Sequence, residues 1–314
     1  MNETNSIARI QTVIREVGNV IVGKDEILIK VILALLAGGH ILMEDIPGVG
    51  KTTLAVSLSK ALGLEYNRVQ FTPDVLPSDI TGYSIFDRNT SEMRYQKGAV
   101  LCNLFIADEL NRATSRTQSA LLQAMEEGQV TVDSHTYTVP QPFVVIATQN
   151  PTGAKGTQML PDSQLDRFML RLSMGYPAHD DEIEMLRRKQ RGISPAAVEQ
   201  VMSREELLRI RLEAGDVYVK DELLDYIVRL GEATRRDSRI LQGASPRASL
   251  ALTSLSKAAA WLQGRDYVLP KDVGFVFRDC IAHRLLWSPE LPDPRQREAV
   301  LKELFSGVKA PSIR

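Results

Sequence analysis

The 314-residue sequence contains few cysteines, no long apolar segment and no excess of either charge. Cys102 and Cys280 lie far apart and form no CxxC pair, so we expect buried, reduced thiols and a cytoplasmic protein. The longest apolar run, residues 31–39, is shorter than the about 20 residues that a membrane-spanning helix needs. The beginning of the chain, MNETNSIARI, lacks the basic and apolar stretches of an export signal. We therefore expect no membrane insertion.

Charge and histidine content argue against further classes of function. Lys and Arg number 38 and Asp and Glu number 39, so the formal net charge is −1 and no general attraction for nucleic acid is expected. No run rich in Lys or Arg and no aromatic stacking motif occurs. The four histidines have no metal-ligand spacing, and no Ser-His-Asp or Cys-His arrangement can be argued. The composition, 44% hydrophobic and 25% charged, is that of a soluble globular protein, and the length suggests about two domains.

Strand-like and helical segments alternate from residue 7 to about residue 175. Two continuous apolar runs, residues 102–107 and 143–148, are typical of strands that are buried on both faces of a parallel sheet. A helix is predicted between them at residues 116–127. This alternation predicts a doubly wound α/β domain with a mainly parallel sheet, which we place at residues 1–178.

A second, all-α domain is predicted at residues 179–314, because strand signals fade there and helical periodicity predominates. Its predicted helices include residues 271–286. Two segments interrupt the α/β pattern of the first domain. Residues 82–98 and 129–140 each have two short strand-like stretches around a polar turn, which predicts β-hairpins.

A glycine-rich segment ending in GVGKTT follows a predicted strand and begins a helix. Gly48 and Gly50 let backbone amides approach phosphate oxygens, and the positive end of the helix favours an anion. Lys51 can reach the β and γ phosphates, and the Thr52 hydroxyl can bind Mg²⁺. The strict phosphate-loop pattern has glycine where this chain has Asp45. The residues predicted to bind the nucleotide here are Pro47, Gly48, Val49, Gly50, Lys51, Thr52 and Thr53.

Polar residues follow two of the predicted buried strands. Asp108 and Glu109 end the run LFIADE, at the carboxyl edge of the sheet, where ligands bind in such folds. Asp108 can hold the metal, and Glu109 can orient and deprotonate an attacking water. Asn150 ends the run VVIATQN and would reach that water from a neighbouring strand, although a plain turn before Pro151 is the alternative. Together with the phosphate loop, these acids predict hydrolysis of a nucleotide rather than binding alone.

Two arginines are candidates for contact with the phosphates. Arg167 lies in QLDRF just before a predicted strand, and Arg247 lies in GASPR at the start of a predicted helix of the second domain. A guanidinium group is permanently charged and suits phosphate oxygens. Either arginine could instead form only a surface ion pair, and the sequence pattern leaves this open.

These motifs resemble those of the AAA+ ATPases, in which GVGKT, an apolar run into two acids, an Asn, LDRF and GASPRA occur in this order. The resemblance narrows to the MoxR family at LMEDIPGVGKT, DELNRATSRTQSALLQAMEEGQVTV, ATQNPTGAKGTQMLPDSQLDRFML and GASPRASLAL. It covers residues 15–290, approximately, and Asp45 is usual in that family. Leu110 is a small departure, since an Ile is more usual there.

The resemblance implies a fold, a reaction and a set of residue roles. It implies a P-loop AAA+ core with an all-α lid, ATP and Mg²⁺ as ligands, and assembly of the chain into a ring, usually a hexamer. MoxR proteins look like chaperone-like remodelling ATPases that typically act with von Willebrand factor A domain proteins, often in metal insertion, enzyme-complex maturation or stress response. The implied roles are Walker A for Gly48 to Thr53, Mg²⁺ binding for Thr52 and Asp108, Walker B for Asp108 and Glu109, sensor 1 for Asn150, an arginine finger acting on the next subunit for Arg167, sensor 2 for Arg247 and adenine contacts for Val22 and Gly23.

Three alternative functions remain open at this point. A DNA-translocating or helicase-type motor usually carries basic hairpins, whereas residues 129–142 contain no Lys or Arg and residues 82–98 have three basic and two acidic residues. An ATP-gated scaffold without turnover would not need Glu109 and Asn150. A magnesium-chelatase-like motor subunit shares much of the motif set but belongs to a different assembly.

Overall fold

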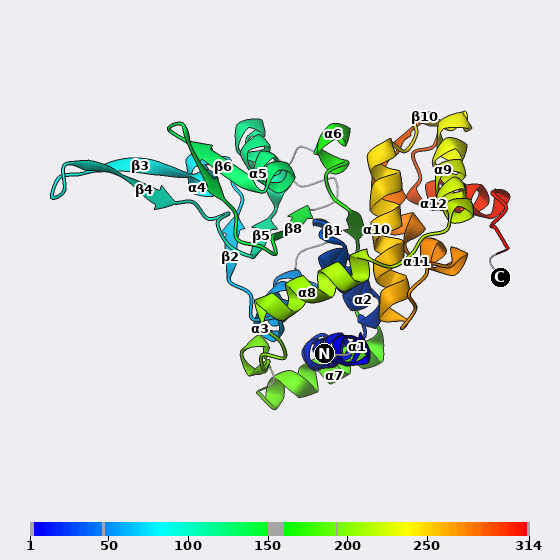
Figure 1. Ribbon diagram of the computed structural model, residues 1–314, viewed down its shortest axis with the longest axis horizontal. Coiled ribbons are helices and arrows are strands. Elements are labelled where there is room, and N and C mark those ends of the chain that lie inside the picture. Colours follow the sequence, from blue (N-terminus) through cyan, green and yellow to red (C-terminus); the bar gives the residue numbers. More distant parts are fainter. Residues whose placement is uncertain (1–2, 46–47, 150–159, 193, 313–314) are drawn as a thin grey trace.

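Five parallel strands form the central sheet of the protein (Figure 1). The computed structural model describes residues 3–45, 48–149, 160–192 and 194–312. The order of the strands is β2-β5-β8-β1-β9, and every neighbouring pair is parallel. The strands are β1 (Ile41–Glu44), β2 (Tyr66–Gln70), β5 (Leu104–Asp108), β8 (Val144–Gln149) and β9 (Leu170–Leu172). Because β5 and β8 are buried along their whole length, the prediction of a doubly wound α/β fold is confirmed.

Alternate side chains of the strands contribute to two separate hydrophobic layers. On one face, Ile106 and Ile146 belong to a cluster with helices α1, α2 and α3. On the other face, Phe105 and Val145 belong to a cluster with α4 and α5. These helices are α1 (Glu3–Gly18), α2 (Asp25–Ala37), α3 (Lys51–Ala61), α4 (Pro77–Thr81) and α5 (Ser115–Glu127). The sheet is therefore covered on both sides, and its carboxyl edge stays accessible for polar residues.

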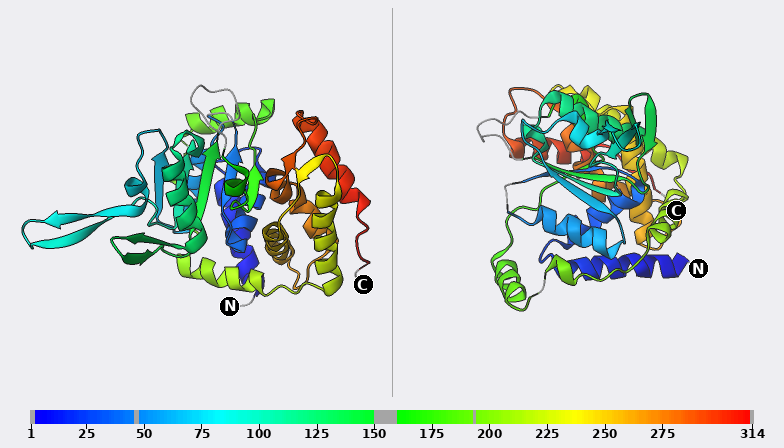
Figure 2. Two further views of the ribbon diagram at one scale, coloured as in Figure 1. Left: turned by 90° about the horizontal axis from the view of Figure 1, so that it is seen from above. Right: turned by 90° about the vertical axis from the view of Figure 1, so that its left-hand side faces the viewer.

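Two antiparallel hairpins extend from the core on the same side of the molecule (Figures 1 and 2). They consist of β3 (Gly82–Asp87) with β4 (Glu92–Lys97) and of β6 (Gln129–Val132) with β7 (His135–Thr138). The rings of Tyr95 and Tyr137 stack with their centroids 3.8 Å apart, which joins the two hairpins. Phe86 and Met93 are 60% and 64% exposed on the longer hairpin, so its surface is partly apolar.

The C-terminal part is mainly helical and packs beside the sheet (Figure 1). Helix α10 contacts α2, α8, α9 and α11, and so it connects this part to the core. The helices after β9 are α7 (His179–Gln190), α8 (Arg204–Gly215), α9 (Asp221–Arg236), α10 (Pro246–Leu262), α11 (Pro270–Ile281) and α12 (Pro294–Gly307), and the short α6 (Asp162–Leu165) precedes β9. The described residues also include the 3₁₀ turns Leu110–Arg112, Pro195–Ala197 and Ala282–Arg284. Within the described ranges, no helix has both the length and the apolar character that crossing a bilayer requires.

Two features of the C-terminal part differ from the sequence-based prediction. A short antiparallel pair was not predicted, because strands of two or three residues leave no alternating pattern. The paired strands are β10 (Ile240–Gln242) and β11 (Leu286–Trp287). The helix predicted at residues 271–286 is also too long, since α11 ends at Ile281. The chain turns there because His283 and Arg284 both donate hydrogen bonds to the carbonyl oxygen of Phe168.

Both cysteines are buried free thiols, as the sequence analysis predicted. Burial raises the pKa of Cys102 and of Cys280 to about 12, so neither thiol is ionised near neutral pH. The two residues therefore act as small apolar side chains in the core.

Candidate active site

The loop between β1 and α3 has the backbone geometry of an anion-binding site. Gly48 and Gly50 have φ values of +88° and +97°, which side-chain-bearing residues rarely adopt. Gly50, which precedes α3, has no side chain that could accept the first N–H groups of the helix. Because the positive end of the helix dipole lies at the same point, the loop suits a phosphate group.

Lys51 begins α3 and is almost completely buried beside this loop. Its ammonium group donates a hydrogen bond of 2.9 Å to the backbone oxygen of Asp45, which holds the side chain over the loop. Burial lowers the pKa of Lys51, and nearby carboxylates partly offset that effect. A cation in this position can bind an anionic ligand strongly, because the surrounding protein screens it poorly.

Asp108, at the end of β5, is the centre of a polar cluster. Its Oδ2 accepts a 2.6 Å hydrogen bond from Nε of Arg68 on β2 and a 3.4 Å bond from the hydroxyl of Thr52. Its Oδ1 accepts a 3.3 Å bond from the hydroxyl of Thr148 on β8. The parallel register places Gln70 of β2 opposite Asp108. Three neighbouring strands thus bring their carboxyl ends to one point.

Glu109 follows Asp108 in a left-handed conformation, with φ +54°, which turns the chain away from β5. Its backbone N–H donates a 2.8 Å bond to the Thr148 hydroxyl, and its carboxylate accepts a 2.6 Å bond from Arg112. A cavity of about 280 Å³ separates these acids from the loop. The residues that line it are Gly48, Gly50, Lys51, Thr52, Thr53, Arg68, Gln70, Asp108, Glu109 and Thr148.

Asp45 has a structural role that accounts for its place in the phosphate loop. Its carboxylate is 5% exposed and accepts hydrogen bonds from the hydroxyl of Ser173 at 2.8 Å and from the N–H groups of Met174 and Gly175. These residues directly follow β9. The side chain therefore fixes the start of the loop to the segment that leads into the C-terminal part, which glycine could not do.

Of the other predicted site residues that the structure describes, none is among those that line this cavity. Asn150 and Pro47 fall outside the described residues. Val49 packs against the main hydrophobic core. Val22 and Gly23 lie in the connection between α1 and α2, where Gly23 approaches α7 so closely that a Cβ atom would fall 2.0 Å from Oδ2 of Asp181.

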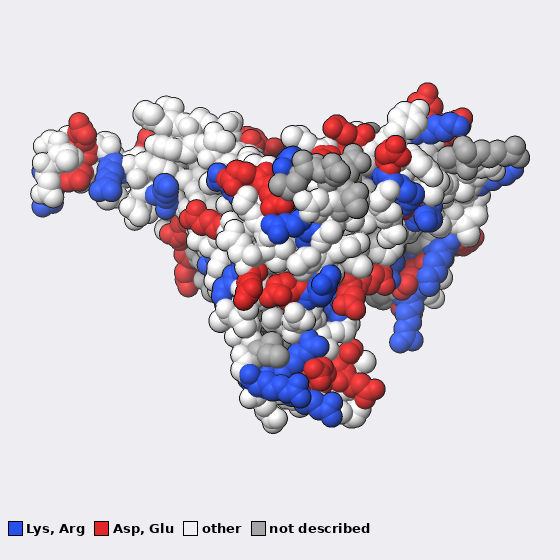
Figure 3. Space-filling view, turned by 60° about the horizontal axis from the view of Figure 1, so that its bottom comes forward, with Lys and Arg blue, Asp and Glu red and all other residues white. Residues whose placement is uncertain are grey.

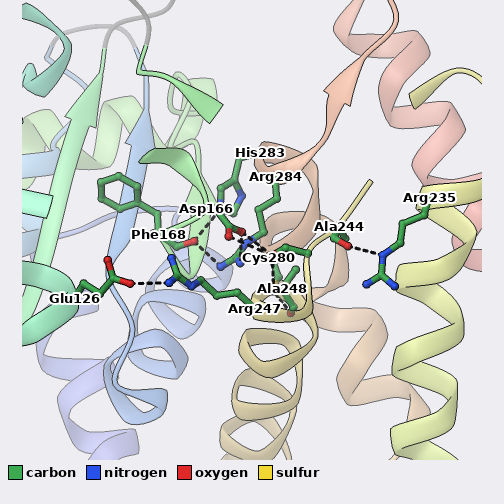
Figure 4. A network of polar contacts seen from close by, with 11 residues as sticks. Glu126, Asp166, Phe168, Arg235, Ala244, Arg247, Ala248, Cys280, His283 and Arg284 are labelled. Carbon is green, nitrogen blue, oxygen red and sulfur yellow. Dashed lines mark hydrogen bonds and ion pairs between the residues drawn. The ribbon is translucent and has the colours of Figure 1, made fainter. Parts of the chain in front are cut away.

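The two predicted phosphate-binding arginines lie together, away from the phosphate loop. One carboxylate, that of Glu126 on α5, pairs with Arg167 at 2.7 Å and with Arg247 at 2.6 Å. Figure 4 shows the pair between Arg247 and Glu126, which joins α10 to α5. Arg167 also donates a 2.8 Å bond to the backbone oxygen of Leu122. The structure therefore gathers the loop and the acids in one cavity and places both arginines at a second location.

Comparisons with known proteins agree with this geometry. Residues 40–170 match the ATPase family associated with various cellular activities (AAA), and residues 232–304 match the AAA lid domain. The protein YeaC of Bacillus subtilis is 43% identical over 95% of this chain and 93% of its own length. The chaperone MoxR1 of Mycobacterium tuberculosis is 37% identical over 97% of this chain and 83% of its own. A solved structure of an ATPase from Cytophaga hutchinsonii superposes with a TM-score of 0.91 at 36% identity, covering 99% and 97% of the two chains.

The chain belongs to the MoxR family of AAA+ ATPases.

Family membership confirms the resemblance that the motifs indicated and the fold class with its helical lid. The AAA match runs from β1 with its phosphate loop to the start of β9, and the lid match covers the end of α9, all of α10 and α11 and most of α12. The cavity between the loop and the two acids lies within the segment that matches the AAA family. Asp45 stands where the strict phosphate-loop pattern has glycine, and its hydrogen bonds to Ser173, Met174 and Gly175 give it a structural role there.

Three further polar residues near these sites were not predicted from the sequence. Arg68 and Thr148 bond to Asp108 from the strands on either side of β5. Glu126 holds both arginines. The order of the strands would have indicated Arg68 and Thr148, because β2 and β8 flank β5. That order cannot be predicted from the sequence pattern. Glu126 is one of several charged residues on α5, and nothing in its spacing distinguishes it.

Proposed function

We propose that this protein hydrolyses ATP in an Mg²⁺-dependent reaction and that its active site is completed by a second copy of the chain in a ring. The observation that carries the proposal is the convergence of Lys51, Thr52, Asp108 and Glu109 on one cavity at the start of α3. Arg167 and Arg247 lie elsewhere and are partly exposed. A single chain thus offers its nucleotide a pocket that contains the loop and the acids, and it presents two further cations at another location.

The residues of the cavity fit a bound magnesium ion. The Thr52 hydroxyl and the Asp108 carboxylate are 3.4 Å apart, and oxygen ligands of this kind are the ones that Mg²⁺ prefers. When bound, the ion would neutralise charge on the β and γ phosphates. Arg68 shares Asp108 Oδ2 with Thr52, so the guanidinium would compete with a metal ion for that oxygen.

We assign the base that activates the attacking water to Glu109. A carboxylate can orient and deprotonate a water molecule once it is free to accept the proton. Its ion pair with Arg112, at 2.6 Å, keeps that carboxylate engaged here, so catalysis requires an exchange of partners. Asn150 remains the proposed partner of the same water, and Val22 and Gly23 the proposed adenine contacts.

In the ring, Arg167 would act on the nucleotide of the neighbouring subunit, and Arg247 would contact the same nucleotide. Two guanidinium groups on the single carboxylate of Glu126 leave a surplus of one positive charge at this point. Phosphate oxygens suit such a pair, because each guanidinium can donate two parallel hydrogen bonds. A cation that is supplied from another chain stabilises the transition state and is worth about 10³ to 10⁵ in rate.

Phosphate release from Mg·ATP tests the hydrolytic role. Glu109→Gln should bind ATP with wild-type affinity but turn it over at least about 100-fold more slowly, because a general base is lost. Glu127→Gln is the matched control, since that exposed carboxylate accepts a bond only from the neighbouring Gln123 among the contacts described for it. Turnover by Glu109→Gln at the wild-type rate would refute the assignment.

The cellular role that we propose is chaperone-like remodelling of a partner complex, as the name of the relative MoxR1 suggests. We further propose a von Willebrand factor A domain protein as the partner and metal insertion or maturation as one outcome. Co-purification with the Glu109→Gln variant, which should retain ATP, tests this. The ATP-dependent recovery of such a domain supports the role, and its absence from the ATP-bound ring contradicts it.

A nucleic-acid motor is the weaker candidate. The hairpin β6–β7 carries no Lys or Arg. Basic and acidic side chains alternate over the face in Figure 3, so no broad basic surface is present on that face. A gel shift that weakens steeply with salt would favour the motor over the remodelling ATPase.

A further inference from the structure

Both neighbours of Arg167 in the sequence are held by the C-terminal part (Figure 4). The carboxylate of Asp166 accepts a 2.8 Å bond from Nη1 of Arg284, and it accepts the hydroxyl of Ser245 at 3.1 and 3.2 Å. The carbonyl oxygen of Phe168 accepts 2.8 Å bonds from Nη2 of Arg284 and from Nε2 of His283. The guanidinium group of Arg284 thus bonds both to Asp166 and to Phe168, the residues that precede and follow Arg167.

The two donors from the 3₁₀ turn Ala282–Arg284 are buried, whereas the Asp166 carboxylate is partly exposed. The side chain of Arg284 is 2% exposed, and His283 is 3% exposed. Burial lowers the pKa of His283 well below its usual value, so the ring is neutral, and its Nε2 must carry the hydrogen that the carbonyl accepts. Buried hydrogen bonds to a charged group are among the strongest in proteins, and these fix the backbone on both sides of Arg167.

Ser245, which bonds to Asp166, also contacts the helix that carries Arg247. The Ser245 hydroxyl accepts the N–H of Ala248 and so caps α10, the helix that carries Arg247 in its first turn. The one side chain therefore bonds both to that helix and to Asp166. A hydroxyl group that touches neither guanidinium thus links the backbone segments that carry the two arginines, in addition to the Glu126 carboxylate that pairs with both.

We infer that Ser245 and Arg284 are positioning residues for Arg167 and Arg247. They hold the two guanidinium groups together so that both face the nucleotide of a neighbouring copy. A movement of the lid that carries α10 and α11 then changes ATP hydrolysis in the next subunit and not in its own. This inference rests on the proposed ring ATPase and goes beyond it by naming the residues that connect the lid to the arginine finger.

Ser245→Ala tests the inference, with Ser203→Ala as the matched control. Both serines cap a helix by accepting a backbone N–H, but Ser203 caps α8 by accepting from Glu206 and is not bonded to Asp166. We expect Ser245→Ala to lower ATP turnover about threefold to tenfold, because small displacements of a catalytic group reduce rate steeply. Nucleotide affinity should stay at the wild-type value. Ser203→Ala should lose thermal stability to a similar extent but keep its turnover.

A mixing experiment identifies the site on which Ser245 acts. Chains with Ser245→Ala are mixed with an excess of Glu109→Gln chains, which cannot hydrolyse ATP but supply an intact Arg167. In a parallel mixture, wild-type chains take the place of the Ser245→Ala chains. The two mixtures should turn over ATP at the same rate, so the deficit of Ser245→Ala should disappear. If the deficit persists, Ser245 acts on its own subunit and the inference is wrong. Asp166→Asn, which keeps the shape of the side chain, should give the same pattern and serves if Ser245→Ala proves unstable.

The experiment separates this inference from the proposed function. If wild-type chains release no phosphate from Mg·ATP, the ATPase assignment fails. If they do, and Ser245→Ala lowers turnover equally in chains that also carry Arg167→Ala, the serine does not act through Arg167. Full activity of Ser245→Ala would likewise overturn the positioning role.

Discussion

Acidification should destabilise the α/β core through His40, which directly precedes β1 and whose ring connects β8 to α5. Its Nδ1 accepts the N–H of Val145 on β8 at 3.0 Å, and its Nε2 lies 3.1 Å from the carbonyl oxygen of Met125 on α5. Because a carbonyl oxygen only accepts, Nε2 carries the hydrogen and Nδ1 does not. A second proton on Nδ1 would face the Val145 N–H and break that bond.

The magnitude of this effect follows from the shift in pKa. Burial, helped by the charge of Arg211, lowers the pKa of His40 from 6.5 to about 4. In the unfolded chain His40 therefore binds a proton near pH 6.5, whereas in the folded chain it does so only near pH 4. The stability that the neutral ring contributes is fully present above pH 6.5 and is lost as the pH falls toward 4. Between pH 7 and pH 4.5 this amounts to at most about 2 kcal/mol of unfolding free energy.

Urea unfolding of His40→Gln at both pH values checks the calculation. The glutamine does not titrate, so its loss of stability on acidification should be smaller than that of the wild type by about 2 kcal/mol. The exposed His179, replaced in the same way, serves as control and should leave the wild-type pH dependence unchanged. An equal loss for His40→Gln and the wild type would refute the reasoning.

Three further predictions concern the nucleotide site. Lys51→Ala should weaken ATP binding at least about tenfold in a calorimetric titration, whereas Lys60→Ala on the same helix should leave the affinity unchanged. Asp45→Asn should lower the free energy of unfolding by about 1 to 3 kcal/mol in urea, because charge-assisted bonds to the segment after β9 are lost. Arg68→Ala should lower the Mg²⁺ concentration for half-maximal nucleotide binding about threefold, since the guanidinium no longer competes for Asp108. An unchanged or raised Mg²⁺ requirement would contradict that competition.

The sequence predicts those parts of the molecule whose physics is local. The run LFIAD is apolar without alternation, which indicated a central strand, and β5 is buried throughout. The helix predicted at residues 116–127 is α5, Ser115–Glu127, which the Thr114 side chain caps and after which Gly128 ends the helix. The loop glycines were recognised by their spacing, and their backbone angles require glycine.

Contacts between distant segments could not be predicted in this way. Arg68 meets Asp108 only because β2 lies beside β5, and a parallel sheet allows several strand orders for one sequence pattern. Arg247 was expected at the nucleotide from the lid, but whether of its own or another subunit depends on how α10 packs. Its pairing with Glu126 places it beside Arg167 instead of in the cavity of its own chain.

The helix end at Ile281 has the same explanation. Apolar spacing continues through residues 282–286, so the pattern alone extends the helix. The chain leaves the helix because Arg284 bonds to the Asp166 carboxylate and to the Phe168 carbonyl oxygen, which are 118 and 116 residues away in the sequence. Such long-range polar contacts decide local structure without leaving a periodic signal.

Mixing two inactive variants tests the central claim, hydrolysis at a site shared by two chains, most directly. Glu109→Gln chains retain Arg167 and lack the base, whereas Arg167→Ala chains retain the base and lack the finger. Each variant alone should release phosphate from Mg·ATP at a small fraction of the wild-type rate. An equal mixture should regain a substantial part of it, because some interfaces combine an intact Glu109 with a neighbour's intact Arg167. A mixture no more active than its components, under conditions in which wild-type chains are active, would contradict the shared site.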